Sequence, residues 1–226
     1  MSATPPVHVE PASPDTPRYT HDPALRRRFE VHLAAFDRRH RPPAGSGQLR
    51  RAAVALTIVD TGDGTAALVL TRRAATLRAH AGQWALPGGR VDEGEDAVGA
   101  ARRELAEEVG LHIGAADVLG RLDPYPTRSG YSIEPVVVWG GRPDAIAPSP
   151  DEVASVHLVP LGELDHPDAP RYVTIAESDR PVVQMPIAGD LIHAPTAAVV
   201  LQLREVALHG RATRVDHLEQ PVWAWR

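Results

Sequence analysis

The stretch that decides the fold is GRVDEGEDAVGAARRELAEEVGL, which runs from residue 89 to residue 111. Its central part, from Ala97 to Val109, is rich in Ala, Glu and Arg and is followed by Gly110, a residue type that commonly terminates helices. These features predict a helix over residues 97–109. Its apolar side chains gather on one stripe, which we expect to face a core.

A second stripe of the same helix carries carboxylates. At about 100° per residue, Glu104, Glu107 and Glu108 fall on one face, at the i, i+3 and i+4 spacing where side chains are neighbours. Like charges at this spacing repel one another. Hard divalent cations need clustered carboxylate oxygens, and Mg²⁺ commonly bridges them to substrate phosphates. Arg103 lies beside the acids and is suited to hold one carboxylate in a bidentate orientation.

The spacing around the helix argues against an ordinary solvated helix face, which is what three acids alone would indicate. Gly89 is followed after five residues by Glu95, and seven further residues lead to the run from Arg103 to Leu111. Seven fixed residues and two apolar ones at these distances arise by chance at about one in a million or less in a chain of this size. We therefore interpret the stretch as a functional motif.

This motif resembles the signature of the Nudix hydrolases, G-x5-E-x7-R-E-U-x-E-E-x-G-U with U apolar, and every position is filled. The resemblance implies an α/β fold, namely a Nudix-type α/β/α sandwich with a mixed β-sheet and a loop–helix–loop catalytic box. It also implies that the box binds Mg²⁺ or Mn²⁺ and that the protein hydrolyses a diphosphate linked to another moiety.

Carried over by position, the resemblance assigns roles to the residues of the motif. Glu104 is a candidate base, and Arg103 is expected to orient one of the acids. Gly89 would let the loop turn, while Glu95 and Gly110 would be structural. The expected metal ligands are Glu104, Glu107 and Glu108.

A further acidic residue from a downstream loop commonly takes part in catalysis in this family. Glu152, in the stretch PDEVASVHLVPL, stands at the start of a strand pattern and is our candidate for this catalytic role. An ordinary exposed loop acid explains its position equally well. The reaction itself needs cations, because a diphosphate carries dense negative charge that must be neutralised before a nucleophile approaches.

Immediately upstream, residues 68–89 read LVLTRRAATLRAHAGQWALPGG and resemble the motif of the coenzyme A diphosphatase branch of the Nudix family. Ala74 stands where Ser is usual and Leu86 where Phe is usual, which bears on the substrate more than on the reaction. The matching positions are Leu70, Thr71, Arg73, Leu77, Arg78, His80, Gly82, Pro87, Gly88 and Gly89. Coenzyme A carries a 3′-phosphate besides its diphosphate, so its site needs additional cations. The residues expected to bind substrate are Arg73, Arg78, Gly88, Gly89 and Arg90.

Three functions are compatible with these motifs. The first is hydrolysis of coenzyme A or acyl-coenzyme A to 3′,5′-ADP and (acyl-)4′-phosphopantetheine. The second is a Nudix diphosphatase for ADP-ribose, nucleoside diphosphate sugars or damaged nucleoside triphosphates. The third is a catalytically silent Nudix domain that binds a nucleotide; such domains usually lose acids of the box, and all are present here.

Composition narrows the class of protein further. The chain has 226 residues and a net charge of −5, and all 24 of its Lys and Arg residues are Arg. This acidic balance argues against a general nucleic-acid binder, and the absence of an uninterrupted apolar stretch of about 18 residues argues against a membrane-spanning helix. With no Cys and no recognisable secretory signal, we expect a cytoplasmic protein whose partner is a small nucleotide diphosphate.

The chain divides into four parts by composition. Residues 1–21, rich in Pro, Ser and Thr, indicate a disordered tail, and residues 22–47 indicate a helix beginning at Asp22 and a linker. The Nudix domain is expected over residues 48–210, opening with two apolar runs joined by TGDG, a hairpin signal. Residues 211–226 form a C-terminal tail, in which Trp223 and Trp225 alternate as in a strand and either dock the C-terminus or contribute to a homodimer contact.

Overall fold

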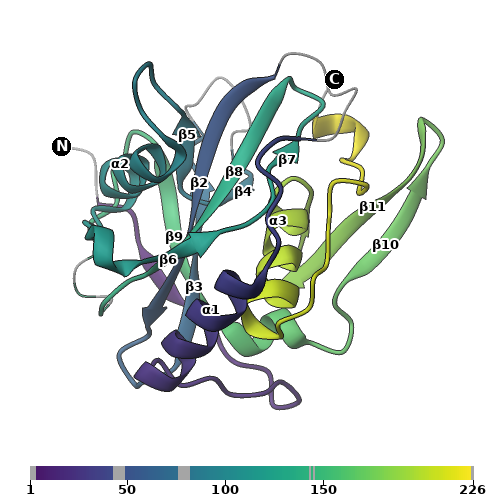
Figure 1. The fold of residues 1–226 in the computed structure, drawn as a ribbon. Helices are drawn as coiled ribbons and strands as arrows, with labels where there is room; N and C mark the ends of the chain where they lie inside the picture. Colours follow the sequence, from purple (N-terminus) through teal and green to yellow (C-terminus); the bar gives the residue numbers. More distant parts are fainter. Residues whose placement is uncertain (1–3, 43–48, 76–81, 143, 145, 225–226) are drawn as a thin grey trace.

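A mixed β-sheet forms the middle layer of the computed structural model, which describes residues 4–42, 49–75, 82–142, 144 and 146–224 (Figure 1). The strands of this main sheet are β1 (Val7–Val9), β2 (Arg50–Asp60), β3 (Ala66–Arg73), β4 (Trp84–Ala85), β5 (Gly88–Arg90), β6 (Val118–Arg121), β7 (Tyr125–Pro126), β8 (Tyr131–Trp139) and β9 (Val153–Pro160). Within the described residues the order is β1-β9-β3-β2-β8-β6, with β4 beside β3, β5 beside β2 and β7 beside β8. The β2–β8 and β1–β9 pairs are parallel, and the β2–β3 and β3–β9 pairs are antiparallel.

A smaller antiparallel sheet and several helices complete the fold. The second sheet contains β10 (Arg171–Ile175), β11 (Ser178–Ile187) and β12 (Asp190–His193). The α-helices are α1 (Pro23–Ala35), α2 (Ala97–Val109) and α3 (Thr196–Gln202), and α3 continues as a π-helical segment over Leu203–Leu208. Short 3₁₀ turns cover Ala115–Asp117, Leu161–Asp165 and Val222–Ala224. No helix in the described part of the chain is both long and apolar enough to cross a bilayer.

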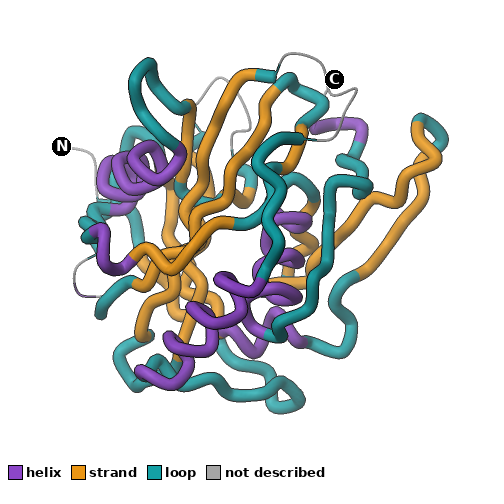
Figure 2. Tube along the Cα trace, viewed as in Figure 1, coloured by secondary structure: helices purple, strands orange, loops and turns teal. Residues whose placement is uncertain are grey.

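The main sheet separates two hydrophobic cores, one on each face. Small residues of β2, Ala53 and Ala55, point toward α2 and let that helix approach closely, whereas Leu56 and Ile58 point to the opposite core. That opposite core is covered by α1, α3 and the second sheet, as Figures 1 and 2 show. The predicted α/β/α sandwich with a mixed sheet is therefore confirmed.

Local signals place the helices and the first hairpin where the sequence predicts them. The Asp22 side chain accepts a 2.8 Å hydrogen bond from the Leu25 N–H and caps α1. Asp96 caps α2 in the same way, and Gly110 ends α2 with a left-handed φ of 77°. The predicted hairpin consists of β2 and β3.

The N-terminal segment differs from the disordered tail that its composition predicts. Val7–Val9 form β1 on the edge of the main sheet, and the Glu163 carboxylate accepts hydrogen bonds from Ser13 and Thr16. These partners lie about 150 positions further along the chain, so local hydrophobicity does not reveal them.

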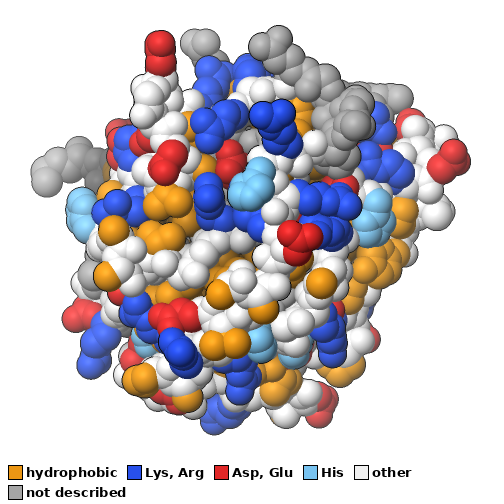
Figure 3. Space-filling view, viewed as in Figure 1, with side chains coloured by type: hydrophobic (Ala, Val, Ile, Leu, Met, Phe, Trp, Pro, Cys, Tyr) orange, Lys and Arg blue, Asp and Glu red, His pale blue; other side chains and the backbone are white. Residues whose placement is uncertain are grey.

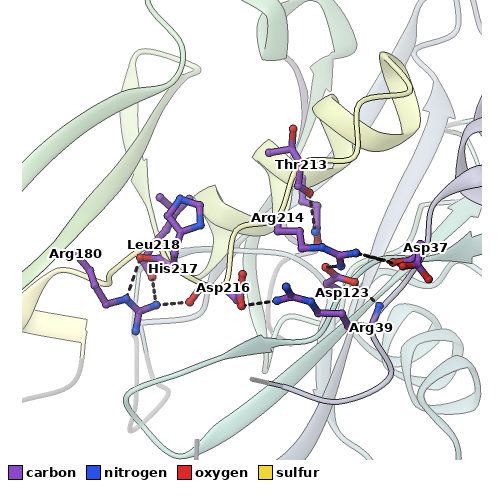
Figure 4. A network of polar contacts seen from close by, with 10 residues as sticks. Asp37, Arg39, Asp123, Arg180, Thr213, Arg214, Asp216, His217 and Leu218 are labelled. Carbon is purple, nitrogen blue, oxygen red and sulfur yellow. Dashed lines mark hydrogen bonds and ion pairs between the residues drawn. The ribbon is translucent and has the colours of Figure 1, made fainter. Parts of the chain in front are cut away.

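The C-terminal segment, residues 211–224, is also held against the rest of the fold by polar contacts, as Figure 4 shows. Arg214 pairs with the buried carboxylate of Asp123 at 2.5 Å, and Arg39 pairs with Asp216 at 2.8 Å. Arg180 donates to the carbonyls of this same segment. The chain then reaches Trp223, which lies in a 3₁₀ turn and not in the strand suggested by alternation; Trp225 lies outside the described residues.

Candidate active site

The site begins where β5 lies against the middle of α2, at Arg103 and Glu104. A side-chain carbon on Gly88 would come within 2.3 Å of the Ala53 carbonyl oxygen, and one on Gly89 within 2.2 Å of Glu104 Oε1. Glycine is therefore required at position 88, where the obstacle is the backbone of β2, and at position 89 a larger residue would displace the Glu104 carboxylate. This close approach sets Glu104 directly beside the loop of the sequence motif.

Two carboxylates of α2 are shielded from water beside β5: Glu108 is buried and Glu104 is half-buried. Burial, and to a lesser extent the charges of Glu104 and Glu152, raises the pKa of Glu108 to about 8 against the opposing effect of Arg73. Burial also raises the pKa of Glu104 above its ordinary value, although Arg103 acts against the increase. The carboxylates of Glu104 and Glu108 are thus close enough to Glu152 for its charge to destabilise the ionised form of both.

Arg103 is the centre of the polar contacts around these acids. Its guanidinium holds Glu95 in a two-point contact of 3.2 and 3.1 Å, and donates to Glu104 at 2.9 Å and to Glu107 at 3.1 Å. A further bond of 3.0 Å reaches the Arg90 carbonyl in β5. Arg103 thus contacts three acids of the motif, and Glu95 is the residue that holds the guanidinium in place; the orienting role of Arg103 stays a prediction.

Glu107 lies apart from the buried acids. Its side chain is 54% exposed and turns toward Arg103 on the outer side of α2. Among the described residues, no three His, Asp or Glu side chains converge closely enough to form a complete metal cage. Arg103 accounts for this arrangement, because it draws Glu104 and Glu107 toward its own guanidinium.

The chemistry of the donor set nevertheless fits a hard divalent cation. Glu108 is 6% exposed, and its nearest cationic atom, on Arg73, lies 4.0 Å away, beyond hydrogen-bonding distance. A buried carboxylate with two further carboxylates nearby carries a large desolvation and repulsion cost. A cation bound by carboxylate oxygens offsets that cost.

Glu152 reaches the site because its loop is tied to the end of α2. The Ala147 N–H donates to the Val109 carbonyl at 2.8 Å, and the Ser149 N–H donates to the Glu108 carbonyl at 3.0 Å. Glu152 itself accepts a 2.9 Å bond at its carbonyl from Ala74, next to Arg73. The exposed side chain of Glu152 therefore stands between the end of β3 and α2, immediately before β9.

A cavity of about 560 Å³ opens beside Gly88 and Gly89. One wall comes from β2, β4 and β5 of the main sheet, and the other from β12, the start of α3 and the turn that carries Trp223. Its volume is within the range of small-molecule sites. The residues around Ile192 and Val199 make the far wall largely apolar.

Two of the three arginines predicted to bind substrate line this cavity. Arg73 and Arg90 both line it, and the buried Nε of Arg73 has no hydrogen-bond partner in the described structure. Arg72 also lines it but is engaged, since it pairs with Asp190 and stacks 4.4 Å from the centre of the Trp84 ring. Arg78 lies outside the described residues.

Comparison with known proteins gives the family. A sequence model of the NUDIX domain matches residues 49–178, more than half of the chain. The chain belongs to the Nudix family. Among curated relatives, the "Uncharacterized Nudix hydrolase NudL" of Cronobacter sakazakii is 44% identical over 117 residues, which cover 50% of this chain and 59% of that protein. The NudL of Photorhabdus laumondii is 42% identical over 125 residues, covering 54% of this chain and 65% of its own. The chain thus spans about three fifths of the length of these curated relatives.

A solved Nudix structure shows a partial likeness to this protein. The crystal structure of RenU, a Nudix hydrolase from M. smegmatis, is 23% identical and covers 70% of this chain and 86% of its own, with a TM-score of 0.47. In this Nudix protein the family match ends at residue 178, before β12, α3 and the C-terminal turn.

The second wall of the cavity was missed by sequence reasoning. Residues 190–224 carry no recognisable motif, and the signal available was the pair of tryptophans near the C-terminus of the sequence, of which Trp223 lines the cavity. Tyr131 also lines the cavity, although it stands in an ordinary strand pattern in the sequence.

Proposed function

We propose that this chain hydrolyses a nucleoside diphosphate linked to another moiety, with coenzyme A or acyl-coenzyme A as substrate and 3′,5′-ADP and (acyl-)4′-phosphopantetheine as products. The observation that supports the reaction is the position of Glu104 and Glu108, two carboxylates whose pKa values are raised by burial. They lie beside Gly89, where a cavity lined by arginines opens. Carboxylates suit Mg²⁺ or Mn²⁺, and arginines suit phosphate. We place the Nudix hydrolase domain at residues 48–210.

The proposed metal ligands are the three acids of α2. Glu104 and Glu108 already face the site, and Glu107 joins them by turning away from Arg103. The chemistry supplied by a bound divalent cation is neutralisation of the diphosphate charge and a lower pKa for the attacking water. Arg103, fixed by Glu95, limits the orientations open to Glu104.

The remaining residues position the substrate and move the proton. Glu104 Oε2, the oxygen that Arg103 does not contact, is our candidate to take the proton of the attacking water, and Glu152 is the second candidate. Arg73 and Arg78 contact oxygens of the diphosphate, and Arg90 contacts another phosphate group of the substrate. The half-buried backbone at Gly88 and Gly89, which carries no side chain, lets the diphosphate come close.

The coenzyme A assignment is supported by residues 68–89, which resemble the motif of that branch of the family. Its test is product analysis after incubation with coenzyme A and Mg²⁺ or Mn²⁺, alongside ADP-ribose, a nucleoside diphosphate sugar and a nucleoside triphosphate. We expect 3′,5′-ADP from coenzyme A with the wild-type protein and with Glu30→Gln, a control on α1, and none with Glu108→Gln.

Two results would contradict the proposal in different ways. Efficient cleavage of another diphosphate without release of 3′,5′-ADP would show that the substrate assignment is wrong and the reaction right. Equal inactivity of the wild type and Glu108→Gln across all these substrates would favour a nucleotide-binding module without catalysis.

A further inference from the structure

Tyr131, the first residue of β8, lies between two guanidinium groups. The Arg50 guanidinium carbon is 4.0 Å from the centre of the Tyr131 ring, and that of Arg90 is 5.8 Å away. In addition, the Arg90 Nε–H donates a 3.1 Å hydrogen bond to Tyr131 Oη. Two cations are therefore gathered on one aromatic side chain.

Strand register explains why these three side chains meet. Arg50 of β2 is paired with Tyr131 of β8, and Ala52 of β2 is paired with Arg90 of β5. Because alternate residues of a strand share a face, Arg50 and Arg90 project from the same side of the sheet. Figure 3 shows blue side chains gathered around the upper end of β2 and β8.

The positive charge of Arg50 and Arg90 has no acidic partner among the residues that the structure describes. Most nearby arginines have a carboxylate partner: Arg38 and Arg51 both pair with Glu134, for example. Across the described residues, by contrast, neither Arg50 nor Arg90 forms an ion pair with Asp or Glu. Two exposed guanidiniums brought together without an acid repel each other, and a bound anion reverses the sign of that interaction.

The arginine pair is continuous with the candidate active site. Arg90 and Tyr131 line the cavity, together with the hydroxyl-bearing residues Thr127 and Ser129. Arg90 directly follows Gly89, whose backbone lies against Glu104. Since Gly89 is paired with Ala53 in β2, three residues from Arg50, the two places are about 10 Å apart along the strand.

We propose that Arg50, Arg90 and Tyr131 bind a second anionic group of the substrate, a phosphomonoester held about 10 Å from the diphosphate. The inference rests on the proposed function and narrows it. A phosphomonoester carries close to two negative charges at neutral pH, which two guanidiniums match, and the Tyr131 hydroxyl donates a further hydrogen bond. Of the candidate substrates, coenzyme A carries such a group on its ribose, whereas ADP-ribose does not.

The test compares coenzyme A with 3′-dephospho-coenzyme A, which differ by this phosphate alone. We expect the wild-type kcat/KM to favour coenzyme A by about ten- to hundredfold, the range for hydrogen bonds to a charged group. Arg50→Gln should reduce that preference to about threefold or less, and Tyr131→Phe should reduce it by a smaller factor. Arg27→Gln, a control at a 77% exposed arginine of α1, should leave the preference as in the wild type.

Equal kcat/KM for the two compounds in the wild type would overturn the inference. A fall in kcat/KM by the same factor for both compounds in Arg50→Gln would overturn it as well. If neither compound is cleaved, the substrate assignment fails separately, and binding of 3′,5′-ADP against 5′-AMP by calorimetry then decides the inference. Tighter binding of 3′,5′-ADP that is lost in Arg50→Gln would support the anion site, and equal binding would refute it.

Discussion

Replacing Glu108 with Gln should stabilise the metal-free protein while abolishing its activity. The side chain is 6% exposed, and burial raises its pKa from 4.5 to about 8. Gln has nearly the same shape and no charge, so it removes the desolvation cost without opening a cavity. A residue proposed to bind metal is thus expected to weaken the fold in the absence of metal.

The size of this effect follows from linkage between protonation and folding. A carboxyl group whose pKa is raised by folding stabilises the folded state least at high pH, where its unfolded form is ionised. The free energy of unfolding falls by about 1.4 kcal/mol for each pH unit between 4.5 and 8, the unfolded and folded pKa of Glu108. Above pH 8 the total loss is about 5 kcal/mol. Glu108→Gln should therefore match the wild type near pH 4 and exceed it increasingly up to about pH 8.

Urea denaturation in the presence of EDTA at pH 5, 7 and 9 measures this difference. Adding Mg²⁺ at about a thousand times its Kd should reverse the ranking at pH 7. Binding then adds about 4.1 kcal/mol to the wild type, more than its cost of about 3.5 kcal/mol at this pH, and adds nothing to a variant that cannot bind the ion. Parallel pH profiles of the two metal-free proteins would refute the reasoning, since they would mean that Glu108 is as well solvated in the folded state as in the unfolded one.

Three other substitutions test the arrangement. Gly89→Ala places a carbon 2.2 Å from Glu104 Oε1, so kcat/KM should fall about a hundredfold, while Gly141→Ala, which meets no atom within 4 Å, should not change it. Glu95→Gln removes the two-point partner of Arg103 and should lower kcat about tenfold without changing the circular dichroism spectrum; unchanged turnover would contradict the role of Glu95. Burial alone would raise the pKa of Glu219, but hydrogen bonds from Arg128, the backbone and a serine hold it at about 2. This carboxylate should therefore contribute about 3 kcal/mol above pH 4.5 and lose it as the pH falls toward 2, which Glu219→Gln should show as a shallower acid denaturation curve.

Elements that depend on nearby residues were predictable from the sequence. The helix over residues 97–109 and the cap at Asp22 depend on side chains within one or two turns, so their signals are complete in a short window. The fold class follows from the same motif, since its loop–helix–loop order matches a known family. The pairing of β1 with β9 depends on contacts 149 positions apart, and no local pattern encodes it.

The site shows the same division. Helical spacing brings Glu104 and Glu108 to one face, and the structure places both beside Gly89 and Gly88. The same spacing predicts that Glu107 joins them. However, packing of α2 against the sheet buries one side of that face only, so Glu107 stays exposed and pairs with Arg103. The second cavity wall and the Arg50–Tyr131 contact depend on strand register and chain return, which follow from the folded topology.

The short strand β1 ends the main sheet in a way that limits growth of that sheet. An open strand edge offers unpaired N–H and C=O groups to any passing chain, and β1 occupies the edge of β9 with three residues only. Proline precedes it at Pro5 and Pro6 and follows it at Pro11, so the segment can neither lengthen nor supply a full row of donors. The prolines that made this segment resemble a disordered tail thus end the sheet at β1, and β9, which follows Glu152, is kept from pairing with a second molecule.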